Sequence, residues 1–432
     1  MKTIILKYMP LLLLAVTLQA KDVYNVDELI QYALKNAPDL QITMKEFEAS
    51  AKKSDKAFGY FLPKVDLHLV GGEVASRDIP ANPDTMEQDT LLLGQLSLKQ
   101  LIYDFGKSSG NYQNLKYMQD SSNMNNLQSI SDKIRDVKNA YYNVLRSMAL
   151  INVAKENLKL NEAQLYRAKR YFTAGIRTKI DISDAKVNVI NAKIYLKQVN
   201  YSLKLAYSTL DKVIGVKEIN SPYTILEQNL QMDAVFNTLV PFKMNLTESV
   251  TYAYEHRYSI RKLTSMLKAS QQNTRVSKSQ YYPSLYFSAD YTRQELKDLK
   301  AVLPKEKWQA SFNLDWNLYE GGSSRADIAE KIIQESISQA KLEVLKLQMK
   351  KDVTKEYLNL NESKDRVELS EALLNASKEK FTQAQKRYEN GLSDYIELQQ
   401  ARQSYIDAKS SLVIDYYNYY DALARMYNVI GM

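Results

Sequence analysis

This 432-residue chain contains an internal twofold repeat, which limits its fold more than any other feature. Near the beginning the two copies lie 220 positions apart, whereas later landmarks lie 216 apart. The first copy therefore holds four extra residues, which we place in an exposed loop between Pro63 and Tyr103. The matching segments are Asn25-Val-Asp-Glu28 with Asn245-Leu-Thr-Glu248, Tyr103-Asp-Phe-Gly106 with Tyr319-Glu-Gly-Gly322, Gly175 with Gly391, and Ile214-Gly215 with Ile430-Gly431.

Long stretches of each copy lack the residues that interrupt helices. No glycine lies between Gly110 and Gly175 or between Gly322 and Gly391, and both stretches are rich in good helix formers. Apolar residues alternate spacings of three and four from Leu127 to Ile151, and intervals of seven continue to Phe172. We predict a packed helix roughly 100 Å long that returns after a turn. A shorter helix is expected roughly from Val26 to Gly59.

The stretch WQASFNLDWNLY, from Trp308 to Tyr319, has the period of a strand. Every second residue through Leu318 is apolar, and the residues between are polar. Both tryptophans of the chain, Trp308 and Trp316, lie on the apolar side, about 26 Å apart along an extended strand. This favours a lipid-facing strand whose tryptophans belong to a membrane girdle. The alternative is a soluble sandwich strand that covers a core.

Four strands are predicted, in hairpins at about residues 61–105 and 282–320. Known membrane barrels begin at about eight strands, so four cannot close one. The protein must therefore form an oligomer, and a trimer would supply twelve strands. The four strands are Lys64–Leu69, Leu92–Tyr103, Ser284–Thr292 and Trp308–Tyr319.

The first twenty residues are typical of a secretory signal peptide. Lys2 and Lys7 precede an apolar stretch from Met9 to Leu18, and Ala20 offers a small residue for cleavage. An uncleaved anchor is the alternative. The predicted organisation is a signal peptide at 1–20, a first repeat at 21–215, a linker at 216–245 and a second repeat at 246–432.

Composition argues against several function classes. The net charge is +8, but basic residues are interspersed with acidic ones, which favours a solvated surface over nucleic-acid binding. His68 and His256 are the two histidines, and cysteine is absent from the sequence. We therefore predict no metal site and no cofactor, and no nucleophile with a base can be singled out. The protein is not expected to be an enzyme.

The chain resembles the TolC-like outer membrane efflux protein family in three features. These are the repeat, the proline before each hairpin, and the strand-to-helix junctions Tyr103-Asp-Phe-Gly106 and Tyr319-Glu-Gly-Gly322. The resemblance implies a mainly α fold with membrane β structure. Long antiparallel coiled coils would form an α-barrel, and each protomer would add four strands to a twelve-stranded trimeric barrel. An equatorial domain would include part of 216–245.

Function and partners follow from the same resemblance. It implies a homotrimer in the outer membrane of a Gram-negative bacterium, contacting outer membrane lipid and extending into the periplasm. The duct would be a passive exit for a tripartite efflux pump or a type I secretion system. It would work with a periplasmic adaptor protein and an inner membrane pump of the resistance-nodulation-division or ABC type, without nucleic acid. A coiled-coil structural or adhesive surface protein is the alternative.

The resemblance also implies a gate at the periplasmic turns, which end in Gly175 and Gly391. The family's gating tyrosine corresponds to Tyr388, and the acid that bonds this tyrosine corresponds to Asp181. Opening would swing one helix pair outward at its tip. The alternative is that both residues merely cap or pack the turns.

Two positions depart from the family's pattern. The first of two acids that ring the constriction matches Glu397, but the second falls on Gln400. The expected basic residue after the second turn is Ser393. These departures argue against a tight cation-binding ring and a full basic latch. The first turn carries Arg177, Asp181 and Asp184 instead, so the gate charges are expected to be redistributed between the turns.

Overall fold

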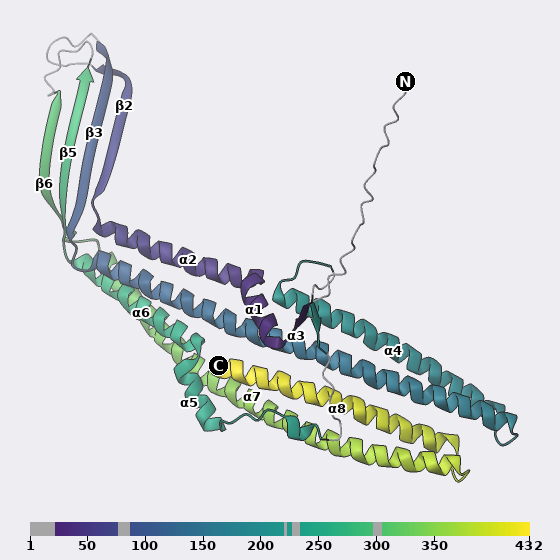
Figure 1. Ribbon diagram of the computed structural model, residues 1–432. Coiled ribbons are helices and arrows are strands. Elements are labelled where there is room, and N and C mark those ends of the chain that lie inside the picture. The colour runs from purple at the N-terminus through teal and green to yellow at the C-terminus, as the bar shows by residue number, and fades with distance from the viewer. Residues whose placement is uncertain (1–21, 77–86, 220–222, 227–233, 297–304) are drawn as a thin grey trace, which may run out of the picture. The chain divides into compact units, whose positions relative to one another are not determined.

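The computed structural model describes residues 22–76, 87–219, 223–226, 234–296 and 305–432 (Figure 1). The expected signal peptide therefore lies outside the described residues. The elements form two compact units. The first comprises the described residues up to 37 together with 136–239 and 365–421, and the second comprises 38–135, 240–364 and 422–432.

The helices repeat in pairs of equal length, which confirms the internal twofold repeat and the mainly helical fold. The longest have 67 residues each, or roughly 100 Å. Their partners after the turns have 36 residues each. The pairs are α1 (Val26–Asn36) with α5 (Leu246–His256), α2 (Pro38–Phe58) with α6 (Tyr258–Lys278), α3 (Lys107–Thr173) with α7 (Ser323–Glu389), and α4 (Lys179–Ile214) with α8 (Tyr395–Ile430).

The starts of α1 and α5 use the same local chemistry. Asn25 Oδ1 and Asn245 Oδ1 each accept the backbone N–H three residues later at 2.9 Å, and Glu28 and Glu248 reach back to the asparagine backbone. The single helix expected from Val26 to Gly59 is two helices, because the backbone is extended at Ala37. Ala37 precedes Pro38, which disfavours helical geometry before it.

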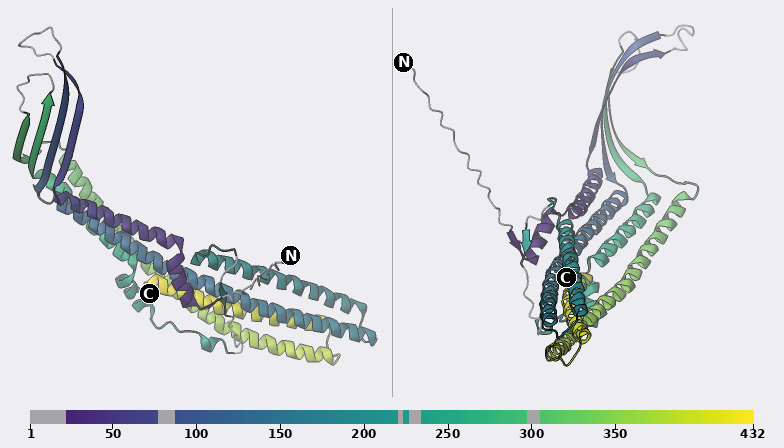
Figure 2. Two further views of the ribbon diagram at one scale, coloured as in Figure 1. Left: turned by 45° about the horizontal axis from the view of Figure 1, so that its top comes forward. Right: turned by 90° about the vertical axis from the view of Figure 1, so that its right-hand side faces the viewer.

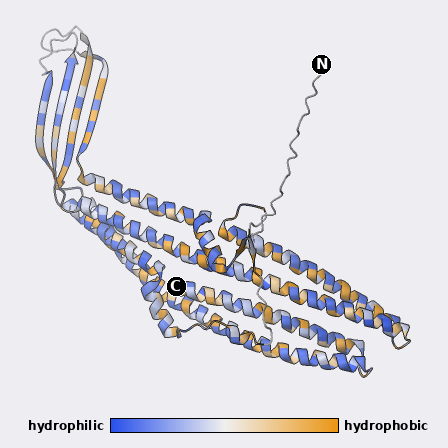
Figure 3. Cartoon of the chain, in the orientation of Figure 1, coloured by the Kyte–Doolittle hydropathy of each residue, from blue (hydrophilic) through white to orange (hydrophobic). Residues whose placement is uncertain are grey.

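The second unit contains an antiparallel sheet in the order β2-β3-β5-β6. Hydrophobic and hydrophilic residues are interspersed along the strands (Figure 3), and the register aligns residues of one kind across the sheet. One row across the sheet is apolar, through Leu67, Leu96, Tyr291 and Trp308, and the neighbouring row is polar, through Asp66, Ser97, Asp290 and Gln309. The strands are β2 (Lys64–Ser76), β3 (Glu87–Tyr103), β5 (Ser284–Leu296) and β6 (Glu306–Asp315).

The sheet's apolar face has no covering layer within the described part of the chain. Leu67 is 66% exposed, Trp308 is 81% exposed and Phe312 is 72% exposed. Strand β6 ends at Asp315, so Trp316 lies beyond the strand on which the period-two pattern placed it. Its indole Nε1 donates to the Tyr281 carbonyl at 3.2 Å.

The first unit is built from the turn-facing parts of the four long helices. Figure 2 shows α4 running back along α3, and α8 along α7, in two antiparallel hairpins. Val137, Val144 and Ile151 are buried, as the heptad spacing predicts. The seam reaches the turn in the second copy, where Leu374 and Tyr388 are buried, but not in the first copy, where Phe172 is 45% exposed. A parallel two-stranded sheet of β1 (Asp22–Tyr24) and β4 (Tyr223–Ile225) completes the unit.

In the described part of the chain, no helix carries an apolar stretch suited to crossing a membrane.

Candidate functional site

The two helical hairpins of the first unit end in turns of one design. Gly175 and Gly391 have φ angles of +71° and +74°, a left-handed conformation that glycine adopts at low cost. In each turn the next N–H bonds a carbonyl five residues earlier. These bonds join Ile176 to Tyr171 at 2.9 Å and Leu392 to Arg387 at 2.8 Å. The turns predicted at Gly175 and Gly391 are thus defined by backbone geometry.

A buried cluster joins the two hairpins on both sides of these turns, and we call it the tip cluster. Its centre is Tyr388, which is 1% exposed. The Tyr388 ring lies 6.2 Å from that of Tyr171 on α3 and 6.3 Å from that of Tyr395 on α8. Small residues allow this close approach. The tip cluster comprises Ala168, Ala185, Ala384, Tyr388, Tyr395, Leu398 and Ala401.

Arg177 binds the second turn from the first. Its guanidinium carbon lies 5.0 Å from the centre of the Tyr388 ring, and Nη2 donates to the Ser393 carbonyl at 3.1 Å. Burial raises the pKa of the Tyr388 hydroxyl, while the positive charge of Arg177 acts in the opposite direction. Arg177 and Ser393 occupy equivalent places in the two repeats. The second turn has no basic residue at position 393, and Arg177 of the first turn supplies a positive charge at that place instead.

Asp181 and Tyr388 lie near each other without a hydrogen bond within this protomer. Asp181 Oδ2 accepts the backbone N–H of Thr178 at 3.4 Å, at the start of α4. The Tyr388 hydroxyl is buried and has no hydrogen-bond partner among the described residues. Asp181 acts on it only through charge, which adds to the rise in the pKa of Tyr388. A gating role for the pair stays a prediction.

The remaining predicted gate residues do not converge on Tyr388. Glu397 Oε1 pairs with Arg387 Nε at 3.2 Å, within its own hairpin. Its backbone N–H is bonded by Asp394 Oδ1 at 2.8 Å, which fixes the start of α8. Gln400 and Asp184 are exposed. These three side chains can face a partner or water, but they do not hold the two hairpins together.

Several links between the hairpins have no signal in the sequence pattern. Arg167 Nη1 on α3 contacts Glu389 Oε1 on α7 at 2.5 Å. Further from the turn, Glu156 on α3 receives Lys409 Nζ at 2.5 Å and the Tyr405 hydroxyl at 3.0 Å. Burial alone would lower the pKa of Lys409, but the hydrogen bond and charge of Glu156 outweigh this and raise it.

A polar layer crosses between α4 and α8. Asn188 Nδ2 donates to the Tyr395 hydroxyl at 2.9 Å, and Gln399 Nε2 donates to Asn188 Oδ1 at 2.8 Å. Arg402 is 4% exposed and donates to Gln399 Oε1 at 3.1 Å, and burial lowers the pKa of its guanidinium. Such side chains look like exposed helix residues in the sequence. Only the packed hairpins reveal their pairing.

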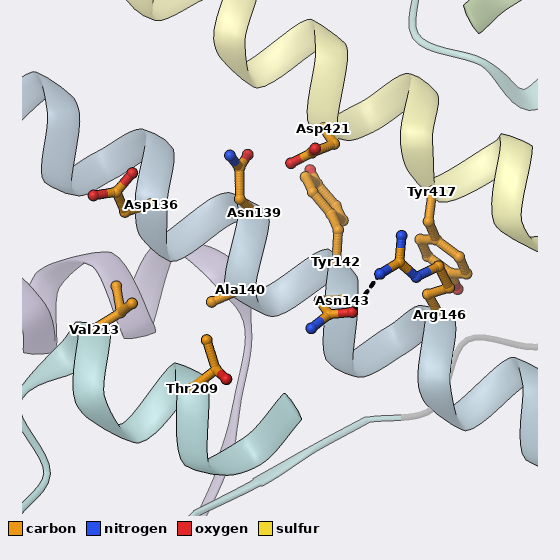
Figure 4. Close-up of a pocket in the computed structure, with 10 residues that line it drawn as sticks. All are labelled: Asp136, Asn139, Ala140, Tyr142, Asn143, Arg146, Thr209, Val213, Tyr417 and Asp421. Atoms are coloured by element: carbon orange, nitrogen blue, oxygen red, sulfur yellow. Dashed lines mark hydrogen bonds between the residues drawn. The ribbon is translucent and has the colours of Figure 1, made fainter. Parts of the chain in front are cut away.

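A separate cavity of about 370 Å³ lies where α3, α4 and α8 meet (Figure 4). Figure 4 shows the Tyr142 side chain pointing toward Asp421, and Arg146 Nη2 donates to Asn143 Oδ1 at 2.6 Å. Burial raises the pKa of Tyr142 to about 12. None of the ten described residues that line it is a histidine, cysteine or serine.

Each repeat combines one β-hairpin with one long helical hairpin, and together with the apolar sheet face this defines the fold class of the chain. The chain belongs to the outer membrane efflux protein family, whose sequence profile matches residues 29–216 and 251–432. Family membership places the protein in the outer membrane, with its helices extending into the periplasm.

Known proteins agree with this assignment. The chain is 21% identical over 300 residues to the antibiotic efflux pump outer membrane protein ArpC of Pseudomonas putida. That match covers 69% of this chain and 60% of ArpC, so the chain spans less than two thirds of this relative. A membrane protein from Pseudomonas aeruginosa has the same fold, with a TM-score of 0.83, 15% identity and coverage of 95% of this chain and 94% of that one. The open state of the Neisseria gonorrhoeae MtrE outer membrane channel matches with a TM-score of 0.78 and 17% identity. That match covers 94% of this chain and 88% of the MtrE chain.

Proposed function

We propose that the protein is a passive exit duct in the outer membrane, serving a tripartite efflux pump or a type I secretion system. Family membership and the efflux function in the name of ArpC support this proposal. A duct of this kind catalyses no covalent chemistry. The alternative of an adhesive coiled-coil protein is less well supported, since it gives no role to a sheet with one apolar and one polar face.

The sheet carries the proposal. Its apolar row through Leu67, Leu96 and Trp308 is exposed, while the opposite face holds a polar network. In that network Asn313 Nδ2 donates to Ser288 Oγ at 2.8 Å, and Ser288 and Ser311 lie 3.0 Å apart. Lipid against the apolar face and water against the polar face would suit both faces of the sheet. Four strands are too few to enclose water, so we propose a homotrimer with twelve strands.

The remaining assignments are proposed on the same basis. They comprise a signal peptide at 1–20, repeats at 21–215 and 246–432, and a linker at 216–245 within an equatorial domain. A periplasmic adaptor and an inner membrane pump would supply cargo and energy. Trp308, and Trp316 beyond the strand end, would lie at the two membrane interfaces.

The gate is proposed to be the tip, where the two hairpins of each protomer meet. Arg177, Tyr388 and the Arg167–Glu389 pair link the hairpins close to the turns. Their separation would widen the duct, as a change between two packed arrangements. The other predicted gate residues would then change the electrostatic potential at the periplasmic opening of the duct without holding the hairpins together. They are Asp181, Asp184, Glu397 and Gln400.

Conductance across a planar bilayer tests the duct and its gate together. We expect small, mostly closed currents from the wild-type protein. Arg177→Met keeps the stem but removes the hydrogen bond to Ser393 and the charge over Tyr388. The ratio of open to closed states should rise roughly 10- to 30-fold, since the two contacts together are worth about 1.5–2 kcal/mol.

Arg170→Met is the matched control. Arg170 stands in the last turn of α3, 6.0 Å from the exposed Tyr166 ring, and does not reach the second turn. Its replacement should leave the currents unchanged. Large wild-type currents that neither variant alters would keep the duct and remove the gate from the tip. A purified protein that never inserts would contradict the duct itself.

A further inference from the structure

The apolar pattern of β6 continues past the end of the strand, and the internal repeat explains this. The equivalent strand, β3, pairs with β2 only as far as Lys99, yet it continues to Tyr103 because its last residues pair with β5 on the other side. Strand β6 pairs with β5 as far as Asp315, the residue equivalent to Lys99, and then ends. In the described sheet, residues 316–319 therefore lack the second neighbour that orders residues 100–103.

The repeat also predicts which strand would supply that neighbour. Strands β2 and β5 have 13 residues each and lie 220 positions apart, so they are equivalent. Strands β2 and β6 are the two edges of the described sheet. The N–H and C=O groups on the outer side of an edge strand can pair with another chain. Strand β6 of one protomer can therefore pair with β2 of the next protomer, as β3 pairs with β5 within the chain.

The register of this contact follows from the register inside the chain. Lys99 on β3 pairs with Ser288 on β5. Asp315 is the equivalent of Lys99, and His68 is the equivalent of Ser288. Asp315 therefore comes opposite His68 of the next protomer, and both side chains are exposed in a single chain.

The apolar face of the sheet continues without a break across this contact. The register gives two apolar pairs, in which all four side chains are more than half exposed in a single chain. They are Leu314 with Leu69, and Trp316 with Leu67. The exposed Phe312 comes opposite Gly71, where an aromatic ring can cover the backbone of a glycine in an edge strand. A shift of one residue would instead turn apolar side chains toward the polar face.

We propose that protomers join through β6 and β2 in this register, so that Asp315 of one protomer faces His68 of the next on the polar side of the sheet. The proposal rests on the trimer proposed above and specifies how its protomers bind. A carboxylate attracts a protonated imidazole and accepts a hydrogen bond from a neutral one, so the pair is favourable in either state of the histidine. Pairing with β2 extends β6 to Tyr319 and brings Trp316 into the strand.

Cysteine cross-linking tests the register, because the natural chain has no cysteine. In the purified full-length protein, His68→Cys combined with Asp315→Cys should form a disulfide between protomers. Residues directly opposite in an antiparallel sheet have Cα atoms about 4.5–5.5 Å apart, which a disulfide spans. The variant should run as covalent dimers and trimers under non-reducing conditions and as monomers after reduction. Lys99→Cys with Ser288→Cys is the matched control, since its disulfide forms within one chain.

Two shifted pairs test other registers on the same face. Asp66→Cys and Val70→Cys, each combined with Asp315→Cys, place the cysteines diagonally, about 7–8 Å apart. A disulfide does not span this distance without movement of the backbone. The cross-linked fraction should be at least about tenfold lower than in the pair with His68→Cys. A stronger cross-link in either shifted pair would overturn the register.

Charge reversal gives a second measurement without cysteines. His68→Glu places two carboxylates opposite each other at every contact between protomers. The association constant of the trimer in detergent should fall at least about threefold, and adding Asp315→Lys should restore it. An unchanged association constant in His68→Glu would overturn the pairing of these two side chains.

The remaining outcomes separate this inference from the proposed function. If the pair within the chain forms its disulfide and none of the three pairs between protomers does, β6 and β2 are not neighbours and the inference fails. A cross-linked trimer that carries no current across a planar bilayer would contradict the duct and leave the register intact.

Discussion

At the scale of single residues, two glycines set how closely the ends of α4 and α8 approach neighbouring backbone. Gly215 has φ +84°, and a Cβ there would lie 2.8 Å from the Asn36 carbonyl oxygen. Gly431 has φ +90°, and its Cβ would lie 3.2 Å from the Arg257 Cα. Gly215 thus meets the backbone of residues 36 and 37, and Gly431 meets that of residues 256 and 257, which occupy equivalent places in the repeats. The paired Ile-Gly segments in the sequence thus mark two equivalent contacts.

Gly215→Ala should lower the free energy of unfolding by roughly 2–4 kcal/mol, because a strained φ and a clash with backbone act together. The midpoint of thermal unfolding in detergent measures the effect. Gly175→Ala is the control, since Gly175 has φ +71° but nothing within 4 Å of a Cβ. It should cost only about 1 kcal/mol. Equal losses in the two variants would show that the contact with Asn36 adds nothing.

Residues at the tip show which parts of a site the sequence can predict. The repeat located Gly175 and Gly391, because a turn glycine depends on local spacing, and the resemblance located Tyr388. The partner of Arg177 is a backbone carbonyl 216 positions away. Such a contact depends on how two hairpins pack against each other, which no local pattern encodes. The same limit applies to Asn188 and Gln399.

At the scale of elements, periodicity predicted the type of structure better than its limits. The alternation from Trp308 to Leu318 continues past the end of β6 at Asp315, because side-chain pattern alone does not record where backbone pairing stops. The break at Ala37 had a local signal in Pro38, which follows it. The equivalent break at Arg257 has the same extended backbone without a proline. Contact with Gly431 accompanies it there.

The junction between α6 and α7 should be sensitive to acid. Asp327 on α7 accepts hydrogen bonds from Ser277 and from Gln280 of the turn after α6, and Lys331 lies 3.6 Å away. The Ser277 hydroxyl is the main cause that lowers the pKa of Asp327, with Lys331 and Gln280 contributing. A lowered folded pKa contributes stability above the unfolded pKa, near 3.9, and this stability is lost as pH falls through the folded pKa.

Asp327→Asn should therefore lower the thermal midpoint at pH 7 by an amount that corresponds to about 1 kcal/mol. The difference from wild type should shrink as the pH falls below about 4, where Asp327 of the unfolded chain takes up a proton, and should vanish below the lowered pKa of Asp327 in the folded protein. Glu330→Gln is the control, because Glu330 also contacts Lys331 but its side chain is 70% exposed. A difference that stays constant from pH 7 to pH 3 would exclude a role for the charge.

At the scale of the whole molecule, the exposed apolar residues of α4 need a partner. Ile180, Val187, Ile194 and Tyr201 recur at intervals of seven and are each more than half exposed. A second heptad stripe on a helix that already has a buried seam is typical of packing against another chain. Together with the open edges of β2 and β6, this stripe fits neighbouring copies in the proposed trimer.

Ile194→Glu should weaken assembly, because it places a charge in the proposed interface between copies. We expect the association constant of the trimer in detergent to fall at least about tenfold. Light scattering or heat-dependent electrophoresis measures the trimer fraction from which this constant follows. Lys186→Glu changes the charge more but lies on the neighbouring polar stripe of α4, and it should leave assembly intact. A monomeric wild type would contradict the trimer. A trimer that tolerates Ile194→Glu would place the interface on other faces of the helices.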